Sequence, residues 1–162
     1  MRRIGEVLLI GPKGAGKADF IRALCEDVEL NDRTMHLGRL SISDQLVLHF
    51  YGIHAGKNIP SFPWDLLAQK MLGCIVLFHW YSPESFEEAK YLIDFFTSRY
   101  QVPMVVAANV SGSDDFSVPE RIYKGGIDIT PEGKFTFCNT DDPASVRETV
   151  VNLIDIIMKR FS

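Results

Sequence analysis

GPKGAGK, at residues 11–17, is the stretch of this sequence that decides its fold. The apolar, partly β-branched run before it, at residues 4–10, is typical of a buried strand. After it, residues 17–27 carry apolar side chains at the spacing of an amphipathic helix. A GxxxxGK pattern between a strand and a helix predicts a phosphate-binding loop, and with it an α/β fold.

The residues of this loop are of the types that phosphate binding requires. Gly11, Gly14 and Gly16 allow backbone N–H groups, with that of Ala15 among them, to converge on phosphate oxygens. Lys17 is placed to reach the outer phosphates, and the helix that begins there adds positive potential at its N-terminus. The glycines could also serve only a tight turn, so the motif indicates ancestry more strongly than present binding.

The two residues after Lys17 depart from the motif. The first is normally Ser or Thr, whose hydroxyl binds Mg²⁺, whereas Ala18 has no oxygen to offer. At Asp19, a carboxylate about 4 Å from a phosphate would cost about 4 kcal/mol at an effective dielectric constant of about 20. An acidic residue in the first turn also favours a helix. Asp19 therefore has two interpretations: a helix cap, or an internal anion that makes a nucleotide unnecessary.

The rest of the chain predicts alternating strands and helices with one early hairpin. Strands are expected at residues 35–42, 45–51, 74–78, 102–108 and 135–138, and helices at 64–71, 82–100 and from 142 onward. This alternation predicts a doubly wound α/β fold with a mostly parallel sheet. Ligands bind at the carboxyl ends of the strands in such a fold, so the loops at 11–18, 52–60, 109–114 and 138–142 are expected to meet at one site.

Composition indicates one globular domain over residues 1–162, with 46% hydrophobic and 23% charged residues. A net charge of −4 argues against a nucleic-acid partner. The first apolar run is too short for a secretion signal or a membrane span, so we expect a cytoplasmic protein. Cys25, Cys74 and Cys138 lack the spacing of metal ligands and are expected to be reduced, buried thiols.

Several stretches, in the same order, resemble a group of prokaryotic small Ras-like GTPases, the MglA-like, roadblock-associated GTP-binding proteins. The stretches are GPKGAGKADFIRAL, MHLGRLSISDQLVLHFYG, WDLLAQKMLGCIVLF, SPESFEEAKYLIDFF and VVAAN, and the resemblance runs from residue 4 to residue 158. It implies a Ras-like P-loop G domain with a six-stranded sheet, GTP or GDP as ligand with Mg²⁺, and homodimeric partners of the roadblock fold. The phosphate loop would be residues 11–18, switch I residues 29–35 and switch II residues 52–63.

The switch positions that carry GTPase chemistry in this family are altered here. In switch I, the threonine that contacts Mg²⁺ and the terminal phosphate falls near Asp32, with Thr34 as an outside candidate. In switch II, Gly56 would meet the terminal phosphate, and Lys57 stands where the family has a water-positioning glutamine. A charged lysine cannot accept a hydrogen bond, so water activation by the usual route is not expected. His54 is a weaker alternative base.

The guanine-reading motif of the family, Asn-Lys-x-Asp, is reduced to its asparagine. Residues 109–112 read Asn-Val-Ser-Gly, and Asp114 or Asp115 could substitute only from two or more positions later. Without the aspartate, the donors of the base lose their acceptor, which weakens binding. Asn109 is therefore the one residue of this motif expected to contribute to a nucleotide site.

These departures predict a degenerate Ras-like domain, a pseudo-GTPase, that acts through protein–protein contacts with impaired or absent GTP hydrolysis. No catalytic residue and no metal ligand is expected, and the altered residues argue against tight binding of GTP, GDP or Mg²⁺. The residues expected to contact any nucleotide are Gly11, Gly14, Ala15, Gly16, Lys17, Ala18, Asp19, Gly56 and Asn109.

The sequence leaves two alternative functions open, and the resemblance implies a partner. The chain could instead be a functional GTP-binding switch, in which Asp32 or Thr34 recruits Mg²⁺ and Asp114 reads the base. A small phosphate-loop kinase is the third class. The resemblance implies a roadblock-type partner around residues 30–60. Phe62 and Trp64 either add an apolar docking patch or cover the sheet, and the second interpretation is favoured.

Overall fold

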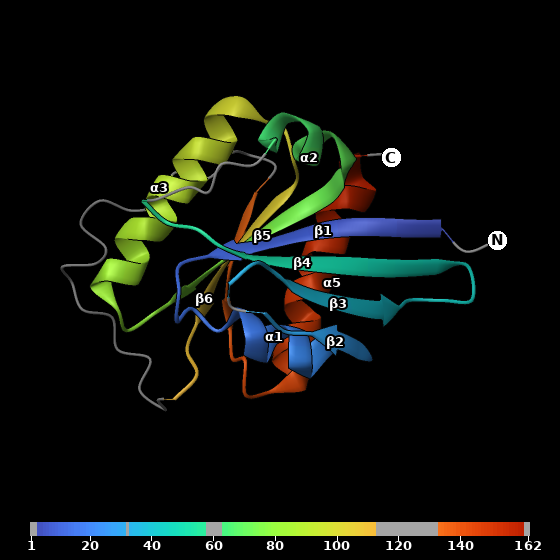
Figure 1. Ribbon diagram of the computed structural model, residues 1–162, viewed down its shortest axis with the longest axis horizontal. Coiled ribbons are helices and arrows are strands. Elements are labelled where there is room, and N and C mark those ends of the chain that lie inside the picture. The colour runs from blue at the N-terminus through green and yellow to red at the C-terminus, as the bar shows by residue number, and fades with distance from the viewer. Residues whose placement is uncertain (1–2, 32, 58–62, 113–132, 161–162) are drawn as a thin grey trace.

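The structure, a computed structural model, describes residues 3–31, 33–57, 63–112 and 133–160. These residues form an α/β fold with four helices and a mixed, mostly parallel sheet of seven strands in the order β2-β3-β4-β1-β5-β6-β7 (Figure 1). The strands are β1 (Arg3–Gly11), β2 (Asp27–Glu29), β3 (His36–Ser41), β4 (Leu46–His54), β5 (Met71–His79), β6 (Met104–Asn109) and β7 (Lys134–Cys138). The helices are α1 (Lys17–Leu24), α2 (Trp64–Lys70), α3 (Pro83–Arg99) and α5 (Pro143–Arg160).

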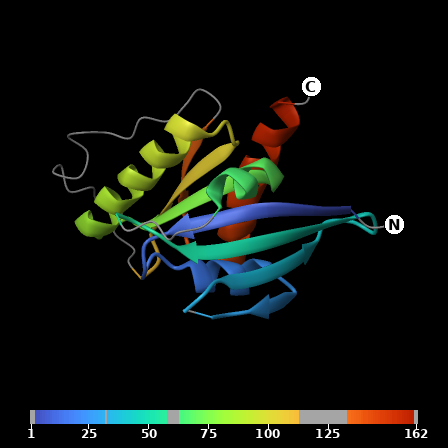
Figure 2. The ribbon, with the colours of Figure 1, turned by 45° about the horizontal axis from the view of Figure 1, so that its top comes forward.

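Helices cover both faces of the sheet, as predicted. Helices α1 and α5 lie on one face and α2 and α3 on the other (Figures 1 and 2). Along β1, Leu8 and Ile10 belong to the core under α2 and α3, while Val7 and Leu9 belong to the core under α1 and α5. A strand buried on both faces reads as a continuous apolar run, which is why β1 and β5 were recognisable in the sequence. Each such side chain stabilises the fold by about 1.5–3 kcal/mol.

The sheet has one strand more than the six predicted, namely β2, whose first residue lies within the range predicted as a helix. Helix α1 ends at Leu24, and Cys25 is already extended. The backbone then pairs with β3, where the N–H of Glu26 donates to the carbonyl of Arg39 at 3.0 Å. Val28, one residue past the end of the predicted helix, is 41% exposed on this edge strand. Pairing with β3 therefore overrides the helical spacing of the apolar residues.

Strand β4 also extends further than its apolar pattern indicated. Its hairpin to β3 is confirmed, with the N–H groups of Ile42 and Ser43 donating to the carbonyl of Leu46. Residues 52–54, predicted to begin a loop, continue the strand in parallel register with β1, so that His54 lies opposite Gly11. The extension satisfies backbone groups that would otherwise be buried without partners. It also brings the following loop to the end of β1.

The short helix α2 and the long helix α3 were both predicted correctly. The Ser82 hydroxyl accepts from the Ser85 N–H at 3.2 Å, which caps α3, and Pro83 occupies its first turn. Trp64 is buried and packs edge-on against Phe96, with ring centroids 5.4 Å apart. Trp64 thus covers the sheet and does not form an exposed docking patch. Its proposed companion at position 62 lies outside the described residues.

Two of the three thiols are buried as predicted, namely Cys74 and Cys138, whereas Cys25 is partly exposed. Burial raises the pKa of Cys25 and of Cys74 to about 12, with the nearby Glu26 carboxylate adding to the effect at Cys25. These thiols therefore stay protonated near neutral pH. None of the helices in the described part of the chain is both long and apolar enough to cross a membrane.

Candidate functional site

The candidate site lies at the carboxyl end of β1, where the direction of strand order changes. Strand β1 pairs in parallel with β4 on one side and with β5 on the other. In open α/β sheets, ligands bind in the crevice outside the strand ends at such a switch point. The predicted phosphate loop, which joins β1 to α1, occupies this position (Figure 1).

Two glycines of the loop have the left-handed backbone that anion-binding nests use, and the N–H of Ala15 between them donates to the carbonyl of Pro12 at 3.2 Å. Gly14 and Gly16 have φ angles of +86° and +104°, in the left-handed region, and Gly16 is the N-cap of α1. A Cβ built on Gly14 would meet no heavy atom within 4 Å, so this part of the loop borders open space. Successive N–H groups in such a turn, backed by a helix N-terminus, create positive potential suited to phosphate.

Lys17 places its ammonium group against the loop itself. Its side chain is 2% exposed, and Nζ donates to the carbonyl oxygens of Gly11 at 2.7 Å and Pro12 at 2.8 Å. The same Gly11 oxygen accepts from the N–H of Ala55, at 2.9 Å, which ties the end of β4 to the loop. The carbonyl dipoles hold a buried positive charge at the inner end of the crevice.

Asp19 lies in the first turn of α1, where an acidic side chain favours the helix. Its carboxylate accepts from Arg22 Nη1 at 3.1 Å, and the two side chains are 55% and 59% exposed. Helix α1 has Gly16 as its N-cap and no hydrogen bond from a capping side chain, so Asp19 acts on the helix through its charge and does not cap an N–H group. The ion pair runs along the exposed surface of the helix and weakens the case for an internal anion. Ala18, beside it, supplies no oxygen.

Asn109, at the end of β6, joins three loops of the site. Its Nδ2 donates to the carbonyl of Ala15 at 2.9 Å and to the hydroxyl of Thr140 at 3.1 Å. Its Oδ1 accepts from the N–H groups of Ser111 at 3.0 Å and Thr140 at 3.3 Å. The side chain is 1% exposed, and these contacts occupy its amide within the protein. A Cβ on Gly16 would lie 2.4 Å from Nδ2, so this asparagine also requires the glycine beside it.

Only some of the predicted switch residues lie near the phosphate loop. Gly56 is buried just past Ala55, and a Cβ on it would come within 2.7 Å of Glu88 Oε1 on α3. The exposed Lys57 lines a shallow hollow with Glu84 and Glu88. Lys57 therefore lies beside the acidic side chains at the start of α3.

The other switch candidates take different positions. His54 is partly buried and meets the buried His36 edge-on, with ring centroids 5.5 Å apart. Thr34 is exposed on the way into β3. Asp32 lies outside the described residues.

The loop after β6 has no acceptor at the predicted base-reading position. Val110 is buried and its N–H donates to the carbonyl of Cys138 at 2.8 Å. Gly112 has a φ angle of +85° and occupies the place of the aspartate. Asp114 and Asp115, the two candidate substitutes, lie outside the described residues.

The predicted convergence of loops is confirmed for the parts that the structure describes. Contacts join the loops after β1, β4, β6 and β7 through Gly11, Ala55, Asn109 and Thr140. Thr140 is the contributor that sequence reasoning did not single out. A polar residue just past a buried strand, at the edge where ligands bind, was the available signal.

No three His, Cys, Asp or Glu side chains, among those the structure describes, are grouped so that they could hold a metal ion. The absence of a hydroxyl at Ala18 agrees poorly with the Mg²⁺ site that the sequence resemblance implies. Comparison of the sequence with protein-family models and with curated proteins found no match.

Proposed function

We propose that this chain is a degenerate Ras-like domain that acts as a protein-interaction module, with GTP hydrolysis impaired or lost. The observation that carries the proposal is the contrast between the loop and its surroundings. The loop keeps its left-handed glycines and its buried Lys17, whereas Ala18 and Gly112 stand where a metal-binding hydroxyl and a base-reading carboxylate are needed. Phosphoryl transfer depends on positioning and on the metal, so a fold without either turns over slowly or not at all.

The contacts of Asn109 support this proposal. The side chain binds loop against loop, which preserves the shape of the site without any nucleotide. A domain that keeps its shape in this way does not depend on a ligand for a defined surface. This property suits a scaffold that is recognised by another protein.

The surface proposed for the partner is the open face of β3 and β4. Leu37, Val47 and Tyr51 are partly buried and Arg39 is exposed on this face, with Ile4 of β1 61% exposed nearby. Helix α1 packs on the opposite face of the same strands (Figure 2). Arg39 lies opposite His49 in the middle of this face, and such a mixture of apolar and polar side chains is typical of non-obligate interaction sites. It falls within residues 30–60, where the resemblance implies a roadblock-type partner.

The proposal predicts that the purified protein binds guanine nucleotides weakly and without dependence on Mg²⁺. Calorimetric titration of GTP, GDP and ATP, each with and without Mg²⁺, measures this directly. Chromatography of the extract from freshly purified protein reports any nucleotide retained through purification. Micromolar or tighter binding that is selective for guanine and requires Mg²⁺ would overturn the proposal.

Two single variants locate the defect within the loop. Ala18→Ser restores a hydroxyl and is expected to make GTP binding stronger in the presence of Mg²⁺, by about tenfold. Asp19→Thr is the matched control, because its carboxylate is already paired with Arg22 at the surface. We expect Asp19→Thr to change affinity less than Ala18→Ser. A larger gain from Asp19→Thr would show that repulsion of phosphate is the main defect.

A functional GTP-binding switch remains the second candidate, and the left-handed glycines of the loop are the observation that favours it. Gly14 borders open space, and the Lys17 ammonium, held by the carbonyl oxygens of Gly11 and Pro12, would have to turn toward the outer phosphates. In this alternative, Asp32 or Thr34 supplies the contact to Mg²⁺ and Asp114 reads the base. The calorimetric titration separates the candidates, because only the switch binds guanine nucleotides tightly with Mg²⁺.

The open face of β3 and β4 gives a separate prediction about partners. Val47→Glu adds a charge to this face and is expected to weaken binding to a roadblock-type dimer by at least about tenfold. Val151→Glu is the matched control, since Val151 is 52% exposed on α5, on the other side of the sheet. Affinity is measured by surface plasmon resonance against a panel of roadblock-fold dimers. Equal affinities of the two variants for a bound dimer would exclude this face as its site.

A further inference from the structure

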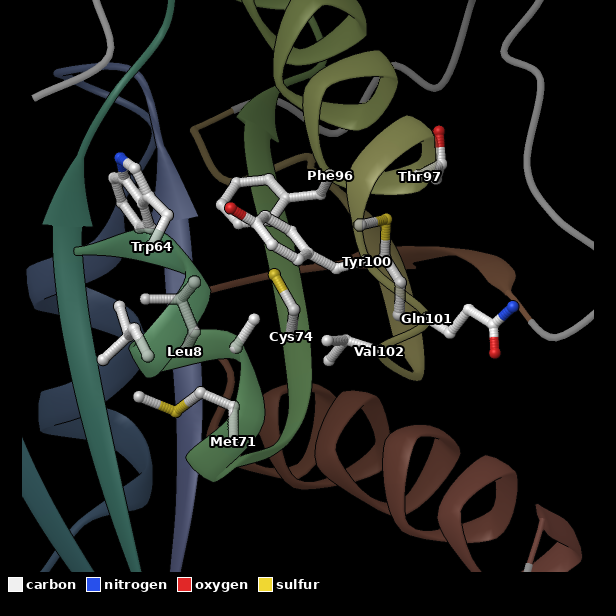
Figure 3. Close-up of a pocket in the computed structure, with 12 residues that line it drawn as sticks. Leu8, Trp64, Met71, Cys74, Phe96, Thr97, Tyr100, Gln101 and Val102 are labelled. Carbon is white, nitrogen blue, oxygen red and sulfur yellow. The ribbon is translucent and has the colours of Figure 1, made fainter. Parts of the chain in front are cut away.

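A second cavity lies away from the phosphate loop, between α2, the end of α3 and the sheet. It has a volume of about 310 Å³. Figure 3 shows the side chains of Leu8, Cys74 and Tyr100 around this space. Met71 and Met104, at the amino ends of β5 and β6, place it at the edge of the sheet opposite to the phosphate loop. The two sites are therefore separate.

The cavity exists because α2 is too short and too small to fill the space beside α3. The helix has seven residues, and one of those that face the cavity is Ala68. Part of the lining belongs to the core, since Leu8, Phe96 and Met104 are each 3% exposed, whereas Thr97 and Tyr100 are partly buried and Gln101 is exposed. The hollow therefore extends from the surface into the core.

The lining determines which ligand this recess could accept. No charged residue lines it among the described residues. Thr97 donates its hydroxyl to the carbonyl of Ile93, and the amide of Gln101 points away from the cavity (Figure 3). Burial raises the pKa of Cys74 to about 12, so its thiol is uncharged there. A buried ionic group would find no partner among these residues, and its desolvation would oppose binding.

Charged groups of both signs lie at the edge of the cavity. The Tyr100 hydroxyl donates to Asp65 Oδ1 at 2.8 Å, and the Arg160 guanidinium donates to the carbonyl oxygen of Gln101. Neither charge lines the cavity itself, so a ligand with an anionic end would lose the hydration of that end without gaining a charged partner inside. A ligand with a neutral hydroxyl end could share hydrogen bonds with the Tyr100 hydroxyl and the Asp65 carboxylate.

We propose that this cavity, the α2–α3 cavity, binds a neutral, mainly apolar small molecule. Its volume is about twice that of the 150 Å³ engineered cavity that binds benzene, and it falls in the range of natural ligand pockets. The ligand class is an aromatic molecule or a medium-length alkyl chain with an uncharged end. This inference does not depend on the proposed function, because neither the phosphate loop nor the open face of β3 and β4 contributes to the cavity.

The two tryptophans of the chain allow a direct test. Trp64 lines the cavity, whereas Trp80 packs against Phe137 at the other end of β5, with ring centroids 4.8 Å apart. In a Trp80→Phe protein, Trp64 is the only tryptophan. Titration with N-phenyl-1-naphthylamine, a neutral aromatic fluorophore, is expected to quench Trp64 emission saturably with one probe per chain. Quenching that fails to saturate, or none at all, would overturn the proposal.

Variants that fill the cavity make the test specific. In the Trp80→Phe background, Ala68→Phe is expected to raise the Kd of the probe at least about tenfold, because its ring occupies the space. Gln69→Phe, on the exposed side of α2, is the matched control and is expected to change Kd by less than about twofold. Cys74→Met fills the space from the sheet and serves if Ala68→Phe does not fold. An unchanged Kd in a folded filling variant would place the probe elsewhere.

Competition identifies the ligand class. 1-Decanol is expected to displace the probe at concentrations at least about tenfold lower than decanoate, because the charged end of decanoate loses hydration in a cavity whose lining offers no charged partner. Equal displacement by the two compounds would overturn the preference for a neutral ligand. The titrations contain no nucleotide, so their outcome leaves the proposed function to its own test.

Discussion

Replacing Asn109 with alanine is expected to lower the free energy of unfolding by about 2–4 kcal/mol, because several buried polar groups lose their partners together. The change removes the acceptor of the Thr140 and Ser111 N–H groups and the donor to the Ala15 carbonyl. Each buried group left unsatisfied costs about 1–3 kcal/mol, although such losses are not additive within one network. The site would then lose the link between its loops.

Urea unfolding measures this loss as a shift in the transition midpoint at constant slope. Asn139→Ala is the matched control, since the Asn139 side chain accepts from the exposed Asp141 N–H, two residues later in the same loop, at 2.9 Å. We expect a loss below about 1 kcal/mol for this control. Similar losses of unfolding free energy in the two variants would show that the Asn109 side chain contributes no more to stability than a single local hydrogen bond.

Most of the fold could be predicted because local patterns and tertiary packing agree. The run at residues 74–78 is apolar throughout and forms the buried centre of β5. Ser82 and Pro83 carry the signature of a helix start, and α3 begins at that point. In each case the side chains that define the pattern are the ones that the core or the cap uses.

The pattern failed where distant pairing decides the structure. Nothing local marks residues 27–29 as a strand, and their pairing with β3 depends on residues eight to twelve positions later. The end of β4 has a similar cause, since Gly52 continues the strand because β1 is there to pair with it. Local propensity is a weak guide to edge strands for this reason.

The sequence predicted which loops meet at the candidate site, but only some of the contacts that their side chains make. The loops that meet were the expected ones, because parallel strands bring their carboxyl ends to one edge. The orientation of Asp19 toward Arg22, and the enclosure of Asn109 by Ala15 and Thr140, depend on rotamers and neighbours that no spacing reveals. The α2–α3 cavity gave no signal at all, because its lining has the composition of any apolar core.

The sequence motif does not reveal why each glycine of the phosphate loop is required. We expect Gly11→Ala to lower the free energy of unfolding more than Gly14→Ala does. Gly11 is outside the left-handed region, so its backbone alone would accept a side chain. A Cβ there would lie 2.0 Å from the carbonyl oxygen of Leu77 in the centre of the sheet. Neither backbone can move aside without breaking the pairing of β1 and β5.

We expect Gly11→Ala to lower the free energy of unfolding by at least about 3 kcal/mol, the range of severe overpacking in a core. Gly14→Ala is the control: at a φ of +86° and with nothing within 4 Å, it adds about 1–2 kcal/mol of backbone strain alone. Urea unfolding gives the free energy of unfolding of both variants. The loss at Gly11 reports the steric clash, and the loss at Gly14 reports the strain of a positive φ angle. A greater loss for Gly14→Ala would mean that β5 yields to the new methyl group. The displaced Gly11 oxygen would also leave Lys17 Nζ and the Ala55 N–H, so a large loss at Gly11 would remove the phosphate site together with the fold.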